Sequence, residues 1–95
     1  MIDITHKSPT LRTATAQAVL KVSSAETILA IKNKTVPKGD VLEMAKTAGL
    51  FGVKKTSEMI PDCHPLPIEE TRVEYEFDGL QVRILMHVST IYKTG

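Results

Sequence analysis

Residues 72–88, RVEYEFDGLQVRILMHV, carry the strongest structural signal in this chain. Before Asp78-Gly79 and again after it, apolar and polar side chains alternate, and alternation with a period of two is typical of a half-buried strand. An Asp-Gly pair between two such runs favours a two-residue hairpin turn. The stretch therefore predicts an antiparallel hairpin that turns at Asp78-Gly79. One face should be apolar, formed by Val73, Tyr75, Phe77, Leu80, Val82, Ile84, Met86 and Val88.

Towards the N-terminus, residues 13–22 also alternate and predict a half-buried strand, while residues 1–11 are predicted to form an irregular arm. Ser23 and Glu26 have the spacing of a capping box, so we expect a short helix to begin there. Its apolar side should consist of Ile28, Leu29 and Ile31.

Asp40 is a good N-cap for a second helix, which we expect to end at Gly49. Residues 50–60 predict a further short helix, broken by Pro61. The buried stripe of the second helix should be Val41, Leu42, Met44, Ala45 and Ala48.

The expected order is thus strand, helices, strand, strand. A right-handed strand-crossover-strand unit followed by a hairpin strand is the first part of a ferredoxin-like split βαβ fold, of the α+β class. The last helix and strand of that fold are absent from residues 1–95. We therefore expect one incomplete domain, which leaves the outward apolar positions Val19 and Leu85 poorly covered.

Composition narrows the function classes. The formal net charge is +1, so no overall charge attracts nucleic acid or a membrane. No run approaches the ~20 apolar residues of a membrane helix, and the N-terminus does not read as a signal peptide. The single cysteine excludes an internal disulfide and fits a reducing compartment, so a cytoplasmic location is expected.

Three prolines surround a thiol and an imidazole in Pro61-Asp62-Cys63-His64-Pro65-Leu66-Pro67. Prolines restrict this stretch to a stiff, non-helical loop. Adjacent extended residues point to opposite sides, so direct activation of Cys63 by His64 is not expected. A metal site is also not expected, because the other histidines lie at no ligand spacing. Two readings remain: a hydrogen-bonded structural histidine, or a rigidly held acid/base or substrate donor.

A second candidate is Lys38-Gly39-Asp40, where Gly39 frees the backbone just before a helix N-terminus, a place that favours anions. The positive end of the helix would lower the pKa of Lys38 if that side chain were partly buried, which would suit proton transfer. The alternative is an ordinary solvated lysine. Lys7, Arg12, Lys54 and Lys55 supply further cations, which form either a solvated surface or, where they converge, an anion site; at most one of the two adjacent lysines is expected to take part.

Several of these motifs together resemble the cyclic pyranopterin monophosphate synthase family of molybdenum cofactor biosynthesis, and the resemblance spans nearly the whole chain. The segments that carry it are Ile2-Asp3-Ile4 with Lys7, Thr10 and Arg12, then Lys38-Gly39-Asp40-Val41, Ala48-Gly49-Leu50, Lys54-Lys55-Thr56-Ser57, Ile60-Pro61-Asp62-Cys63-His64-Pro65-Leu66 and Lys93-Thr94-Gly95.

The resemblance implies a lyase that converts 3′,8-cyclo-7,8-dihydroguanosine 5′-triphosphate into cyclic pyranopterin monophosphate and pyrophosphate. It implies no cofactor and a homo-hexamer, a trimer of dimers with active sites between subunits. Lys38 matches the first catalytic lysine and His64 the active-site histidine. Asp62 and Cys63 fall in the substrate-contacting loop, although Asp62 replaces a residue that is often aliphatic. Lys7, Arg12 and Lys54 match basic positions assigned to phosphate.

The family's Lys-Thr-Gly is followed by a Glu-Met-Glu stretch and a helix with a catalytic aspartate and a second catalytic lysine, none of which is in this sequence. We therefore expect a truncated chain with doubtful activity alone, or a non-catalytic ligand-binding or assembly module of the same fold. Nucleic-acid binding is disfavoured, because only Tyr75, Phe77 and Tyr92 could stack bases and the first two share the predicted core face.

Overall fold

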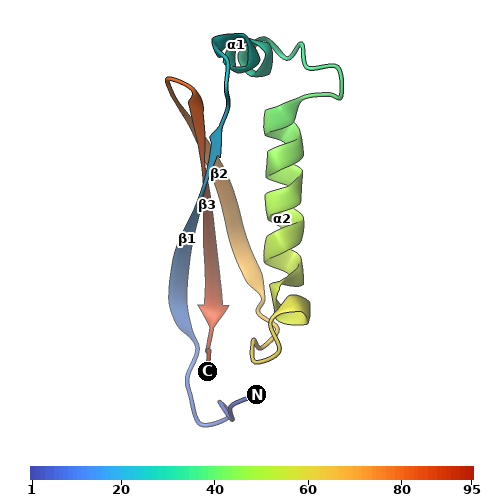
Figure 1. The fold of residues 1–95 in the computed structure, drawn as a ribbon. Coiled ribbons are helices and arrows are strands. Elements are labelled where there is room, and N and C mark those ends of the chain that lie inside the picture. The colour runs from blue at the N-terminus through green and yellow to red at the C-terminus, as the bar shows by residue number, and fades with distance from the viewer.

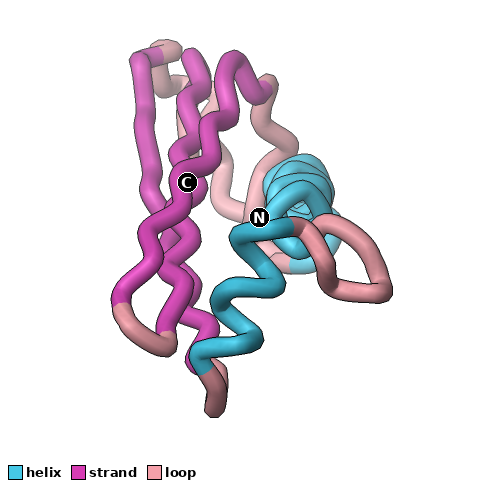
Figure 2. Tube along the Cα trace, turned by 90° about the horizontal axis from the view of Figure 1, so that it is seen from above, coloured by secondary structure: helices cyan, strands magenta, loops and turns pink.

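A three-stranded sheet with two helices on one face forms the computed structural model, which describes all residues 1–95 (Figures 1 and 2). In chain order the elements are β1 (Thr10–Lys21), α1 (Ala25–Asn33), α2 (Val41–Met59), β2 (Ile68–Asp78) and β3 (Gln81–Tyr92). The strand order is β1-β3-β2 and both pairings are antiparallel, so β1 and β2 run parallel with β3 between them. This arrangement confirms the predicted α+β split βαβ topology, which is compatible with a ferredoxin-like fold.

The β2–β3 hairpin has the predicted apolar face. Val73 pairs with Met86, Tyr75 with Ile84 and Phe77 with Val82, which places these side chains on the same side of the sheet. The predicted turn is wrong by one residue. Asp78 still pairs with Gln81, so the loop is Gly79-Leu80, and Gly79 takes a φ of 57° that suits glycine.

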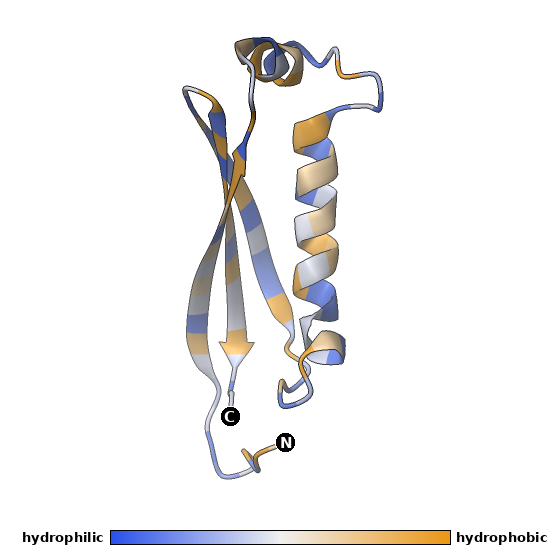
Figure 3. Cartoon of the chain, in the orientation of Figure 1, coloured by the Kyte–Doolittle hydropathy of each residue, from blue (hydrophilic) through white to orange (hydrophobic).

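Strand β1 continues this face, since Ala14, Ala16 and Ala18 pair with Val88, Met86 and Ile84. The strand begins at Thr10, three residues before the predicted start, so Thr10 and Leu11 belong to the strand and not to the expected arm. It is not half-buried as predicted: every residue of β1 is exposed, because α2 packs along β2 and leaves the β1 side of the sheet open. Alternating bands of hydropathy along the strands are visible in Figure 3.

Helix α1 closes one end of the sheet. Its N-cap is Ser24, whose hydroxyl accepts from the Glu26 amide at 3.1 Å, so the predicted cap at Ser23 is wrong by one position. Ile28 and Ile31 are buried against Val82, whereas Leu29 is 56% exposed and does not belong to the apolar side as predicted.

Helix α2 begins where predicted, with the Asp40 carboxylate accepting from the Glu43 amide at 3.2 Å. The predicted end at Gly49 is wrong, because the helix continues without a break to Met59. Gly49 instead allows the close approach of α2 to the sheet: a Cβ there would overlap the Met86 Cε atom. The predicted stripe is wrong at Met44 and Ala48, which are both exposed, although Ala48 borders a cavity between α2 and the sheet.

The hydrophobic core is small for the length of the chain. Only five residues are buried, of which Ile4, Ile28, Ile31 and Val82 are apolar. The radius of gyration is 16.8 Å, against about 12 Å expected for a compact domain of this length. Most of α2 and β1 therefore contributes surface rather than core. Neither helix has the length and apolar character needed to cross a membrane.

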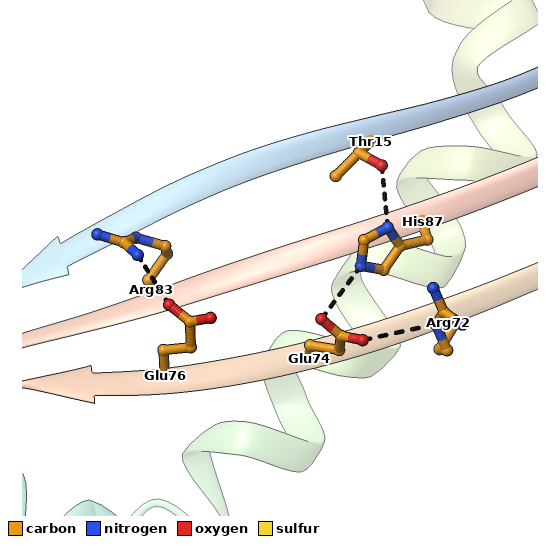
Figure 4. A network of polar contacts seen from close by, with 6 residues as sticks. All are labelled: Thr15, Arg72, Glu74, Glu76, Arg83 and His87. Atoms are coloured by element: carbon orange, nitrogen blue, oxygen red, sulfur yellow. Dashed lines mark hydrogen bonds and ion pairs between the residues drawn. The ribbon is translucent and has the colours of Figure 1, made fainter.

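The outer face of the sheet is polar and cross-linked between strands (Figure 4). Thr15 Oγ1 lies 2.9 Å from His87 Nδ1, and His87 Nε2 lies 3.3 Å from Glu74 Oε2. Arg83 donates to Glu76 at 2.7 Å. These contacts lie beside the two outward apolar positions, where Val19 is 42% exposed and Leu85 is half-buried.

Candidate functional site

The proline-rich loop, residues 61–67, joins the end of α2 to the start of β2 at the lower end of the molecule in Figure 1. It begins with a turn in which the Cys63 amide donates to the Ile60 carbonyl at 3.0 Å. It ends at Pro67, whose carbonyl accepts from the buried Thr90 hydroxyl of β3. The loop is non-helical, as the prolines require, and both of its ends are held by hydrogen bonds. It can therefore aim its side chains from a fixed backbone.

His64 lies between two cavities. The first, about 220 Å³, is lined by Lys54 and Ser57 of α2 and by Cys63 and His64. The Cys63 thiol donates to the His64 backbone carbonyl at 3.4 Å and makes no hydrogen bond to the imidazole. A half-buried imidazole beside an ammonium group and a hydroxyl can exchange a proton with a bound anion and help to hold it.

The second cavity, about 330 Å³, opens on the other side of His64 and is also lined by Asp62, Thr94 and Gly95. The Asp62 side chain is 88% exposed and lies 3.7 Å from the amino group of Met1. The carboxylate therefore faces solvent at the rim, with a positive charge beside it. Solvent and the neighbouring amino group screen the negative charge of Asp62, so it repels a phosphate held next to His64 only weakly.

Three cations from the chain ends gather at the same end of the molecule. Lys7 donates to the Thr94 carbonyl at 2.7 Å, and Arg12 donates to the Thr94 hydroxyl at 2.8 Å. Hydrogen bonds from Thr5, above all from its backbone amide, lower the pKa of the Asp3 carboxyl, and the positive charge of Lys93 lowers this pKa further. Lys7, Arg12 and Lys93 thus bring positive charge to this end of the molecule, which also carries the carboxylates of Asp3 and Asp62.

Lys38 lies at the opposite end of α2 from His64. The helix has 19 residues, so at 1.5 Å per residue it separates these ends by about 28 Å. Gly39 has a φ of 124° and allows the tight entry into the helix, as its position suggested. The Lys38 side chain is exposed, so the partial burial on which its expected tuning depends is not present in this chain.

The structure thus brings together Cys63, His64 and Lys54, with Asp62 at the rim and the cations Lys7 and Arg12 nearby, and it leaves Lys38 apart. Lys55 does not line the cavity and instead lies 3.4 Å from Glu58.

Sequence reasoning assigned no role to Ser57 and Thr94, which line the two cavities. Ser57 follows Lys54 by three residues, so helical spacing alone could have placed both on one face. The motif Lys93-Thr94-Gly95 does not reveal the contacts of Thr94, because its partners Lys7 and Arg12 are 87 and 82 residues away in the chain.

Known proteins resemble this chain along its whole length. The chain is 45% identical over its whole length to the probable cyclic pyranopterin monophosphate synthase of Sulfurisphaera tokodaii and covers 62% of that protein. It is 50% identical to the cyclic pyranopterin monophosphate synthase of Nitratidesulfovibrio vulgaris and 40% identical to the probable synthase of Archaeoglobus fulgidus, and covers 60% of each. The chain thus spans less than two thirds of the length of these relatives. The MoaC family model matches residues 1–95, and the chain therefore belongs to the MoaC family.

Proposed function

We propose that this protein takes part in molybdenum cofactor biosynthesis as the lyase that converts 3′,8-cyclo-7,8-dihydroguanosine 5′-triphosphate into cyclic pyranopterin monophosphate and pyrophosphate. Membership of the MoaC family and the names of its relatives support the proposal. The free cysteine suits the reducing cytoplasm, where we place the reaction.

The observation that carries the proposal is the position of His64, fixed by a hydrogen-bonded loop between two cavities and close to Lys54. The reaction needs the triphosphate charge to be neutralised, a role that suits the ammonium group of Lys54. It also needs proton transfer to and from ring nitrogens and a ribose hydroxyl, a task suited to an imidazole, which can both accept and donate a proton. Cys63 and Asp62 then shape the walls, and Asp62 stays at the solvent side.

The cavity beside His64 and Lys54 is about 220 Å³, which is below the roughly 300–1,000 Å³ of most small-molecule sites. Lys38 lies about 28 Å away along α2. We therefore propose that one copy supplies Lys38 and another supplies His64. In a two-fold pair the exchange is reciprocal, so the two α2 helices run antiparallel and two equivalent sites form. Three such pairs would make the hexamer that the family resemblance implies.

Mixing two inactive variants tests the shared site. Lys38→Ala and His64→Ala, expressed separately, should each release little pyrophosphate from the cyclised nucleotide. When both are expressed together with different tags and purified through both tags, one of the two sites in each mixed pair regains Lys38 and His64, which is about a quarter of all sites in hexamers that assemble at random. Arg72→Gln, on the outer face of the sheet, is the control and should leave activity unchanged. If the unaltered protein releases pyrophosphate, activity that does not return in the mixture would contradict a site shared between copies.

A ligand-binding or assembly module is the second candidate, favoured by the distance of Lys38 from the His64 cavity within one chain. Calorimetry with the cyclised nucleotide separates the two. Binding that His64→Ala weakens, without pyrophosphate release by the unaltered protein or any mixture, would support the module. Binding that is unchanged in both Lys38→Ala and His64→Ala would remove both candidates.

A further inference from the structure

Three segments that are far apart in the sequence meet around the imidazole of His64. They are the N-terminal arm, the proline-rich loop of residues 61–67, and residues 93–95, which follow β3. Figure 1 shows both chain ends at the end of the molecule where this loop lies. The 330 Å³ cavity touches all three, since Ile2, His64 and Thr94 all line it.

Residue Thr94 is held from two directions. The Lys7 ammonium group donates to its carbonyl at 2.7 Å, and the Arg12 guanidinium group donates to its hydroxyl at 2.8 Å. Neither Lys7 nor Arg12 lies within ion-pair distance of a carboxylate. Both cations thus direct a charge-assisted hydrogen bond to the same neutral residue, and such bonds are stronger than bonds between neutral groups.

The segment held in this way borders the imidazole. A Cβ built on Gly95 would lie 3.6 Å from His64 Cε1 and 3.8 Å from Nδ1, which is ordinary van der Waals contact. The glycine backbone therefore lies beside the imidazole edge that carries these two atoms. Loss of the Thr94 contacts would free this segment and change the surroundings of the imidazole.

We propose that Thr94 is a positioning residue: Lys7 and Arg12 hold it, and through Gly95 it fixes the environment of the His64 imidazole. This inference deepens the proposed function, on which its catalytic meaning rests. It gives Lys7 and Arg12 a role that differs from direct phosphate contact, since they act through Thr94.

The test follows the imidazole by NMR in the unliganded protein, so it does not depend on substrate or activity. The Hε1 resonances of the three histidines are assigned with single substitutions. Thr94→Val keeps the side-chain shape and removes the hydroxyl, and it should shift the Hε1 resonance of His64. Arg12→Gln should produce a shift in the same direction, and the double variant should produce no further shift, because both changes break one contact. Thr94→Ser keeps the hydroxyl and should restore the native resonance.

Thr15→Val is the matched control, because Thr15 contacts a different imidazole, that of His87 in β3, at 2.9 Å. It should shift the His87 resonance and leave that of His64 in place. Two results would overturn the inference. One is a His64 resonance that is unchanged in Thr94→Val. The other is an Arg12→Gln shift that adds fully to that of Thr94→Val.

Calorimetry with inorganic pyrophosphate supplies a second readout. If Arg12 acts through Thr94, then Arg12→Gln and Thr94→Val should weaken pyrophosphate binding by similar factors, or both should leave it unchanged. Weaker binding in Arg12→Gln alone would show a direct phosphate contact and would overturn the inference. Failure of the proposed lyase activity would leave the NMR result intact, so the two failures are distinguishable.

Discussion

Val82 is the only large side chain that is almost completely enclosed, with 1% of its surface exposed, and it joins α1 to the sheet. Val82→Ala removes two methyl groups from this contact with Ile28 and Ile31. Transfer of these groups alone accounts for about 1.6 kcal/mol, at about 0.8 kcal/mol for each carbon. A cavity that closes only in part raises the expected loss in the free energy of unfolding to about 2–3 kcal/mol.

Urea unfolding followed by far-UV circular dichroism, at one protein concentration, measures this loss. Val19→Ala is the matched control: it deletes the same groups from the exposed strand β1, where 42% of the side chain is already in contact with water. Its loss should be below about 1 kcal/mol. Equal losses in the two variants would refute the conclusion that the core is concentrated where α1 meets β3.

Three further predictions concern single contacts. Asp40→Ala removes the N-cap of α2 and should lower the free energy of unfolding by about 1 kcal/mol. Asp40→Asn keeps a side-chain oxygen and should lower it only slightly. Equal losses in the two variants would exclude the cap as the cause. Burial, helped by the negative charges of Glu43 and Asp40, raises the pKa of Tyr75, so stability is retained below pH 10 and falls as the pH rises from 10 through the folded pKa. Tyr75→Phe should remove this fall in urea titrations at pH 9–11, and an unchanged slope would contradict the assignment. Gly79→Ala forces a side chain into a φ of 57° and should cost about 1 kcal/mol in the same assay, while Gly79→Asn should cost less.

The strands were predictable because their signal is local. The alternation from Val73 to Phe77 fixes which side chains share a face, and the pairing with β3 follows it. The exact position of the turn was not predictable. Asp78 can either be the first turn residue or the last strand residue before the turn, and its pairing with Gln81 shows that it is the latter. A similar one-residue ambiguity moved the cap of α1 to Ser24.

The continuity of α2 could not be read from the sequence. Glycine often ends a helix, but Gly49 lies where the helix meets Met86, and the close approach needs a residue without a Cβ. Met44 and Ala48 follow the helical spacing of a buried stripe, yet both are exposed, and Ala48 borders an open cavity beside Ala16 and Met86 of the sheet. Tertiary contacts, and not spacing, decide these positions.

The candidate site was predictable in its parts and not in its arrangement. Motifs identified His64 and Lys54, and the structure places both beside one cavity. No sequence pattern gives the distance between Lys38 and His64, because that distance depends on whether one helix or two lie between them. Contacts between the chain ends, such as that of Arg12 with Thr94, are equally invisible before folding.

The unbroken course of α2 has a consequence for how this protein can vary. None of its 19 residues is buried, so most exchanges of one side chain for another should be tolerated along it. Insertions and deletions are a different matter, since one extra residue lengthens the rod by about 1.5 Å and turns its two ends by about 100° relative to each other. If reactive groups at both ends must meet those of a neighbouring copy, descendants of this sequence can exchange most side chains of the helix, apart from Gly49, Lys54 and Ser57, but must keep its number of residues.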